Sequence, residues 1–122
     1  MATVAKKDGM VPYYMVTDKG TETGTCAVCV NGEANEHRSM VANLAAANEY
    51  SIDHLHQPEI KAVYEKAQFY YSASFFLTVC PDAAQEVGKH AAENNKVFCG
   101  NMSAPFLIEV PFLFGLMKAV RN

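Results

Sequence analysis

The side chains best suited to chemistry in this sequence are cysteines and histidines. Cys26 and Cys29 form a Cys-x-x-Cys pair, and His54 and His56 form a His-x-His pair. Because a strand is expected around the cysteines, their side chains should point to opposite faces and cannot hold one metal ion together. The histidines fall in a polar stretch, where solvated side chains are expected. We therefore predict no metal site, and no thioredoxin-like redox site, which needs its pair at a helix N-terminus.

Three further residues carry groups that could act as nucleophiles. Cys80, Cys99 and Ser103 each lack an evident base nearby in the sequence, and a nucleophile needs a base or another activating group. The chain also contains no P-loop, no Gly-x-Gly-x-x-Gly motif and no paired-carboxylate motif. Local motifs alone therefore indicate no reaction.

The clearest structural pattern is a βαβ unit. Residues 69–76 are rich in Tyr and Phe and predict a buried strand. Pro81 then favours the first turn of a helix, because proline lacks the N–H that would be unpaired there. The Asn94-Asn95 pair predicts the end of that helix, and residues 97–99 predict a second strand. This order implies a parallel sheet with a right-handed crossover.

Two aromatic residues accompany the carboxyl ends of these strands. Phe75 lies at the end of the first strand, and Phe106 follows the second. Ligands of open α/β sheets bind beyond this edge, and two flat apolar rings there would suit a flat ligand such as a nucleobase. The alternative is that both rings belong to the core, which is the more common location of large apolar side chains.

The first third of the chain predicts a small antiparallel sheet. Residues 11–17, 25–30 and 38–42 have strand-like composition, and Asn31-Gly32 favours a hairpin turn. Residues 33–37 make the connection longer than a two-residue turn, so the first third is expected to form a small antiparallel sheet with a polar loop.

The remaining segments predict helices and connections. Residues 43–50 are rich in alanine and suit a helix or close packing, and residues 51–57 read as a polar connection. Pro58 opens a helix over residues 59–67. Residues 104–120 are apolar on nearly all sides, so we expect them to be covered by more protein than this chain supplies.

Composition excludes several function classes. The chain has 122 residues, of which 50% are hydrophobic, and this predicts one globular domain. With a net charge of −3 and no basic patch, binding to nucleic acid or to an anionic membrane is not expected. No apolar run reaches membrane-spanning length, and the start lacks the core of a signal peptide. The cysteine spacing fits a reducing compartment, so we expect a cytoplasmic protein, or alternatively a nuclear one.

Five short sequence segments, taken together, indicate a protein family more specifically than any of these patterns. They are residues 23–27 (TGTCA), 38–48 (RSMVANLAAAN), 74–79 (SFFLTV), 93–98 (ENNKVF) and 101–106 (NMSAPF). In this order and at this spacing they resemble the eukaryotic adenosine kinases, within the ribokinase-like (PfkB) carbohydrate kinase family. The resemblance extends over nearly the whole chain, from residue 8 to residue 117.

This resemblance implies an α/β, ribokinase-like fold, in which a large parallel-sheet domain is closed by a small antiparallel β lid. Residues 1–48 would form part of the lid and the return to the large domain. Residues 49–122 would form a βαβ unit of the large domain and the helix that follows. The resemblance also implies ATP-dependent, Mg²⁺-assisted phosphorylation of the 5′-hydroxyl of adenosine to give AMP, in a family that is typically monomeric.

The resemblance further implies roles for individual residues. Arg38 matches a lid arginine that approaches the transferred phosphoryl group, where a fixed cation would offset developing charge. Period-2 spacing places Met40 and Ala42 on one strand face, together with Leu44 if the strand continues. This shared face is independently consistent with the lid positions that the resemblance implies for these residues. The positions that would wall or contact the purine are Cys26, Met40, Ala42, Leu44, Phe75 and Phe106.

The resemblance covers only part of a family member. The ribose-binding aspartate, the magnesium-linked Asn-x-x-Glu region, and the segment with the catalytic base and anion hole have no counterpart here, so residues for ATP and Mg²⁺ are largely absent. We therefore expect the chain alone to be inactive, with an apolar C-terminal segment that could self-associate. One alternative is a non-catalytic adenosine-binding or interaction module. Another is a different ribokinase-like sugar kinase, although residues 38–47 and 101–106 resemble adenosine kinases more than sugar kinases.

Overall fold

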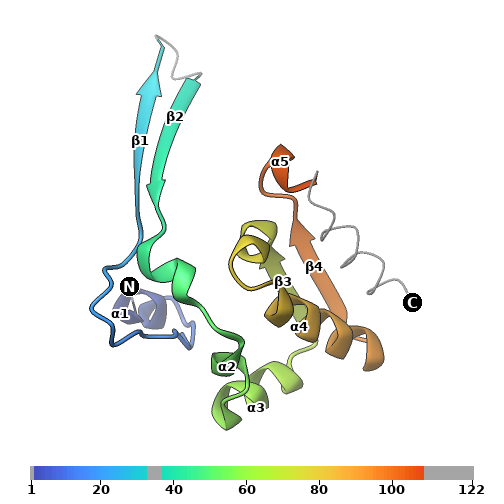
Figure 1. Ribbon diagram of the computed structural model, residues 1–122. Helices are drawn as coiled ribbons and strands as arrows, with labels where there is room; N and C mark the ends of the chain where they lie inside the picture. Colours follow the sequence, from blue (N-terminus) through green and yellow to red (C-terminus); the bar gives the residue numbers. More distant parts are fainter. Residues whose placement is uncertain (1, 33–36, 109–122) are drawn as a thin grey trace.

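The chain forms a long antiparallel hairpin and a separate parallel strand pair, joined by short helices. The computed structural model describes residues 2–32 and 37–108, and Figure 1 shows the hairpin projecting away from the other elements. The elements are α1 (Ala2–Lys7), β1 (Thr25–Asn31), β2 (His37–Asn43), the 3-10 helix η1 (Ala45–Glu49), α2 (Ile52–Leu55), α3 (Pro58–Lys66), β3 (Phe69–Ala73), the 3-10 helix η2 (Ser74–Thr78), α4 (Pro81–Glu93), β4 (Val97–Asn101) and α5 (Pro105–Ile108).

The parallel pair confirms the predicted βαβ unit. β3 and β4 pair in parallel along their full length, and α4 is the crossover between them. Pro81 lies in the first turn of α4, as predicted. At the other end Asn94 caps the helix and Asn95 adopts a left-handed φ of 53°, a conformation that asparagine tolerates better than most residues.

The first strand of this pair is shorter than predicted. β3 ends at Ala73, opposite Asn101, and η2 turns the chain away over the residues that were predicted to continue the strand. The N–H groups of Val79 and Cys80 both donate to the carbonyl oxygen of Phe76. Because β4 offers no partner beyond Asn101, the turn satisfies backbone groups that a longer strand would leave unpaired.

Small side chains let α4 lie directly against one face of the strand pair. The buried residues of α4 are Ala83, Ala84, Gly88 and Ala91. On the same side of β3, Tyr70 is buried and its hydroxyl lies 2.6 Å from the carbonyl oxygen of Tyr64. Phe69 and Tyr71 point to the opposite side and stay 76% and 69% exposed. In the described part of the chain, the strand pair is therefore covered on one face only.

A small core lies where α2, α3 and α4 meet. Its buried members are Leu55, Cys80 and Ala83, and the partly buried residues around it are Tyr50, Ile52, Ile60, Tyr64, Phe76, Val79 and Val87. The prediction that residues 51–57 form a polar connection is therefore wrong. Ser51 caps α2 by accepting a hydrogen bond from the N–H of Asp53, and the helix then turns Leu55 into the core.

The strand predicted over residues 11–17 is also wrong. The segment is irregular, and no strand pairs with it in the described residues. β propensity reflects the fit of a side chain to a sheet surface, and Pro12 supplies no N–H to a ladder. The other two strands of the predicted small sheet do form the hairpin of β1 and β2.

Two further observations concern the apolar parts of the chain. None of the helices described by the structure is both long and apolar enough to cross a membrane. The apolar segment predicted at residues 104–120 begins with α5, and its remainder, together with the expectation that it is exposed, lies outside the described residues.

Replacing Leu55 by alanine tests the small core. The side chain is only 7% exposed, so L55A should lower the free energy of unfolding by roughly 2–4 kcal/mol through lost burial and a residual cavity. Urea unfolding followed by circular dichroism measures the change. The control V63A truncates a side chain of α3 that is 42% exposed and should cost less than about 0.5 kcal/mol. Equal losses in the two variants would contradict this placement of the core.

Candidate functional site

The register of the hairpin places most of the predicted lid residues on one face. Cys26 lies opposite Ala42, Val28 lies opposite Met40, and Val30 lies opposite Arg38. Directly opposed residues of an antiparallel pair point to the same side. Cys26, Met40, Ala42 and Arg38 therefore share a face, which we call the lid face.

The lid face is open to solvent. Every residue of β1 and β2 is exposed, and Met40 keeps 60% of its surface accessible. Arg38 lies toward the tip of the hairpin and makes no ion pair with any residue in the described part of the chain. The arrangement is an apolar strip with one cation at its outer end.

Leu44 does not continue this face. β2 ends at Asn43, and Leu44 has helical backbone angles, with φ −76° and ψ −26°, as the residue that precedes η1. The Asn43 side chain accepts a hydrogen bond from the N–H of Ala45, which helps to turn the chain at this point. The expectation for Leu44 depended on the strand continuing to that residue, and β2 ends one residue before it.

The aromatic edge has the predicted topology. Phe75 lies in η2 directly after β3, and Phe106 lies in α5 shortly after β4. Because β3 and β4 are parallel neighbours, both residues follow the same edge of the sheet. Phe75 is 42% exposed, which does not fit a fully buried core residue. The side chain of Phe106 lies outside the described part of the structure.

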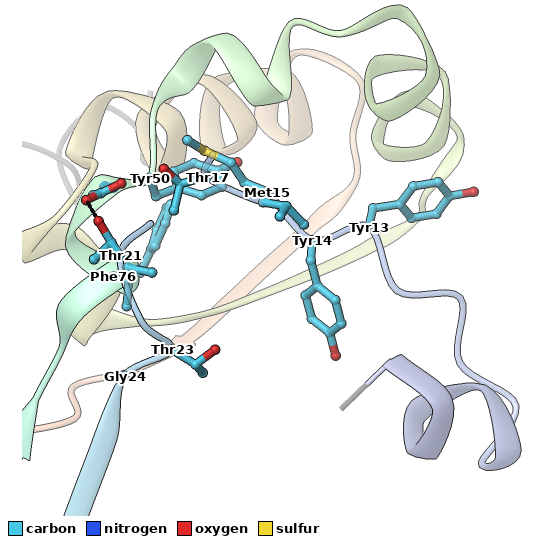
Figure 2. Close-up of a pocket in the computed structure, with 13 residues that line it drawn as sticks. Tyr13, Tyr14, Met15, Thr17, Thr21, Thr23, Gly24, Tyr50 and Phe76 are labelled. Carbon is cyan, nitrogen blue, oxygen red and sulfur yellow. Dashed lines mark hydrogen bonds between the residues drawn. The ribbon is translucent and has the colours of Figure 1, made fainter. Parts of the chain in front are cut away.

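A cavity of about 620 Å³ lies beside the base of the hairpin. Figure 2 shows Thr21, Tyr50 and Phe76 gathered at one end of it and Tyr13 at the other. Its lining residues are Tyr13, Tyr14, Met15, Val16, Thr17, Thr21, Thr23, Gly24, Ala46, Ala47, Glu49, Tyr50 and Phe76.

None of the predicted site residues lines this cavity, but the neighbour of one of them does. Phe76 packs edge to face against Tyr50, with ring centroids 5.1 Å apart. Sequence reasoning chose Phe75 from the Phe-Phe pair and missed Phe76. Strand alternation could not separate their roles, because the pair lies in a 3-10 turn instead of a strand.

Glu49 is the one acidic residue of the cavity lining. Its Oε1 accepts a hydrogen bond of 2.5 Å from the hydroxyl of Thr21, which ties η1 to the segment before β1. This hydrogen bond is the main cause that lowers the pKa of the Glu49 carboxyl below its ordinary value, and the charge of Lys19 acts in the same direction. The carboxyl is therefore ionised at neutral pH. The N–H of Ala46 also donates to the carbonyl oxygen of Glu22, so two hydrogen bonds fasten the base of the hairpin.

The histidines and the Cys-x-x-Cys pair form no shared site. Cys26 and Cys29 fall on opposite faces of β1, as predicted. His56 is exposed and its Nε2 lies 2.8 Å from Glu86, while His54 is buried with Nε2 3.3 Å from the carbonyl oxygen of Tyr13. The expectation of a solvated His54 is wrong, because α2 turns this side chain inward.

The described residues do not fit a magnesium site. No three side chains of His, Cys, Asp or Glu gather within residues 2–32 and 37–108. A magnesium ion binds through carboxylates, phosphates and water. A magnesium site in this protein would therefore need ligands other than the residues that the structure describes.

Comparisons with known proteins agree with one another. Residues 1–121 match the pfkB family carbohydrate kinases. The chain is 57% identical to adenosine kinase 2 of Arabidopsis thaliana over 99 residues, which cover 81% of this chain and 27% of that protein. It is 46% identical to the adenosine kinase of Dictyostelium discoideum over 112 residues, or 92% of this chain and 32% of that protein. The chain thus spans less than a third of each of these relatives.

Solved structures give the same result for the fold. The adenosine kinase of Schistosoma mansoni, in complex with adenosine in an occluded loop conformation, has a TM-score of 0.86 at 33% identity, covering 96% of this chain and 33% of that one. The adenosine kinase of Anopheles gambiae, in complex with P1,P4-di(adenosine-5) tetraphosphate, has a TM-score of 0.82 at 37% identity, covering 95% and 34%. The predicted ribokinase-like α/β fold is confirmed.

Replacing Glu49 by glutamine tests the charge at the cavity. A carboxyl whose pKa is lowered by folding stabilises the protein above its unfolded pKa, and this contribution is lost as the pH falls through the folded pKa. Wild-type stability should therefore fall on acidification, and E49Q should fall less, because glutamine keeps the acceptor without the charge. Urea unfolding at a series of pH values from 7 to about 3 measures this difference.

The matched control is E59Q, which changes an exposed glutamate of α3. It should reproduce the pH dependence of the wild type. Identical profiles for E49Q and wild type would contradict the role of the Thr21 hydrogen bond.

Proposed function

Since the chain belongs to the pfkB family of carbohydrate kinases, we propose that it forms the lid hairpin and part of the nucleoside-binding edge of an adenosine kinase. The reaction would transfer the γ-phosphoryl group of ATP to the 5′-hydroxyl of adenosine. The observation that carries this proposal is the lid face, which unites Cys26, Met40, Ala42 and Arg38 on one side of a projecting hairpin. The similarity to adenosine kinases along nearly the whole chain supports it.

The apolar part of the lid face suits a purine. Cys26, Met40 and Ala42 offer no charge and no strong hydrogen-bond donor. They would therefore favour a ligand with a flat apolar surface over a free sugar. Their exposure means that a bound base would remove apolar surface from water, which is the main favourable term in such contacts. A hairpin that closes in this way would also exclude water from the reaction.

The aromatic edge would supply the opposite wall. Phe75 and Phe106 follow the same edge of the parallel pair, where open α/β sheets bind their ligands. Stacking on aromatic rings is worth about 1–3 kcal/mol for each base. This edge and the lid face would together enclose the base without a specific hydrogen bond from either.

Arg38 would act on the transferred phosphoryl group. It shares the lid face with the apolar strip and lies toward the tip, so it would approach the far end of a nucleoside held by that strip. A guanidinium stays charged at all relevant pH values and matches the geometry of phosphate oxygens. Its role would be to stabilise charge in the transition state, which is most of what phosphoryl transfer requires from a protein.

The rest of the site would come from regions of an adenosine kinase that lie outside the part aligned with this chain. Parallel sheets are almost always covered on both faces, yet Phe69 and Tyr71 on the outer face of β3 remain largely exposed. ATP and Mg²⁺ would bind on those further parts. We also propose a reducing cytoplasmic or nuclear location, in keeping with four cysteines that form no disulfide.

The proposal predicts that activity requires the remaining domain. The purified 122-residue chain should form no AMP from ATP and adenosine, because the family segment that would carry the base for the 5′-hydroxyl has no counterpart in this sequence. A chimera in which this chain replaces the matching region of Arabidopsis thaliana adenosine kinase 2 should form AMP in an adenosine-dependent way. A coupled assay with each protein measures both outcomes.

Two results would overturn the proposal or change it. A well-folded chimera without adenosine-dependent AMP formation would reject the kinase assignment. If calorimetry showed saturable adenosine binding by the isolated chain while that chimera stayed inactive, a non-catalytic adenosine-binding module would be favoured instead.

Replacing Arg38 by alanine in the chimera tests its role. R38A should lower kcat by about 10²-fold or more with a small change in the KM for adenosine, because the cation would act mainly in the transition state. K89A is the matched control, since Lys89 is an exposed cation on α4, and it should retain wild-type kcat. A normal kcat in R38A would remove Arg38 from the mechanism.

A further inference from the structure

Hydrogen bonds connect the carboxyl ends of β3 and β4 through side chains. The Asn101 amide donates through Nδ2 to the hydroxyl oxygen of Tyr71 at 2.6 Å. The Ser103 hydroxyl donates to Oδ1 of Asn101 at 2.7 Å. The Ser103 Oγ in turn accepts a hydrogen bond of 3.2 Å from the backbone N–H of Phe75. The series runs from β3 through β4 to the first turn of η2.

Ser103 holds this place in an unusual backbone conformation. Its φ is 56°, in the left-handed region that residues other than glycine seldom adopt. This conformation turns the chain between β4 and α5 and keeps the hydroxyl within reach of both Asn101 and Phe75. The single hydroxyl acts as donor to one and acceptor to the other, so neither alanine nor glycine could replace it.

The backbone of Phe75 is fixed at both of its polar groups. Its N–H donates to Ser103, and its carbonyl oxygen accepts a hydrogen bond of 2.8 Å from the hydroxyl of Thr78. The Phe75 residue is 42% exposed, so burial alone does not determine where its ring lies. These two hydroxyls hold the backbone from which the ring projects.

We propose that Ser103 is a positioning residue for the nucleoside site. It holds the Phe75 turn at a set distance from α5, which carries Phe106, and so sets the spacing of the two aromatic residues at the sheet edge. Ser103 touches neither the base nor the phosphoryl group in this proposal and acts through Phe75. The inference rests on the proposed function of this edge.

Two variants separate the hydroxyl from the backbone conformation. S103A removes the hydroxyl and keeps a side chain at a positive φ, whereas S103G removes the hydroxyl and relieves that strain. S72A is the matched control, since within residues 2–32 and 37–108 the hydroxyl of Ser72 donates to the carbonyl oxygen of its neighbour Ala73 and not to η2 or α5. The first measurement is the hydrogen exchange rate of the Phe75 amide in the 122-residue chain. The second is the KM for adenosine and for ATP in the chimera.

The expected result is a change confined to Phe75 and adenosine. In S103A and S103G the Phe75 amide should exchange faster than in wild type, and the KM for adenosine should rise about three- to tenfold, as for one lost hydrogen bond. The KM for ATP should stay unchanged, and S72A should match wild type in every measurement.

Each contrary outcome has a distinct meaning. Unchanged Phe75 exchange in both variants would overturn the inference, whether or not the chimera is active. Faster exchange with an unchanged KM for adenosine would also overturn it, since Phe75 would then move without consequence. Normal behaviour in S103G together with a defect in S103A would assign the effect to backbone strain. Failure of the wild-type chimera to phosphorylate adenosine would instead count against the proposed function.

Discussion

The arrangement of the site depends on the parallel pairing of β3 with β4. Parallel neighbours need a crossover, and α4 supplies it with small side chains that let the helix lie directly on the sheet. The same pairing brings the carboxyl ends of both strands to one edge. Phe75 and Phe106, separated in sequence by α4 and β4, thus become neighbours in topology. Without this pairing neither the aromatic edge nor the hydrogen bonds through Ser103 would exist.

The hairpin obeys a different constraint, which is the register between its strands. A slip of one residue in β2 would turn Met40 and Arg38 to the side opposite Cys26 of β1, so that the three would no longer share a face. Among the residues that the structure describes, no core packs on either face to hold the register, because both strands are exposed. The anchor lies at the base instead, where Thr21 bonds to Glu49 and a methyl group on Gly24 would come within 2.7 Å of the Leu44 carbonyl oxygen. Close approach at that point leaves little freedom for slippage.

Much of the fold followed from local patterns, and the failures had long-range causes. The helix from Pro81 to the asparagine pair was predictable because its ends depend on backbone chemistry of adjacent residues. Residues 11–17 looked like a strand, but a strand needs a partner that sequence does not reveal. His54 was expected in solvent because its neighbours are polar, yet one turn of helix carried it inward. Period-2 spacing correctly placed Met40 and Ala42 on one strand face, but it did not hold for Leu44, because the strand ended first.

The two exposed surfaces of this chain have a common explanation. The outer face of the parallel pair and both faces of the hairpin carry apolar side chains, including Phe69, Tyr71 and Met40, that are costly to leave in water. A protein tolerates such surfaces where another segment or a ligand covers them. In a nucleoside kinase, burial by another protein segment and burial by the substrate would have different effects. Cover over Phe69 and Tyr71 would be permanent and would stabilise the fold. Cover over Met40 would come and go with the substrate, so part of the binding free energy of the base would be the apolar area that the open hairpin leaves unburied.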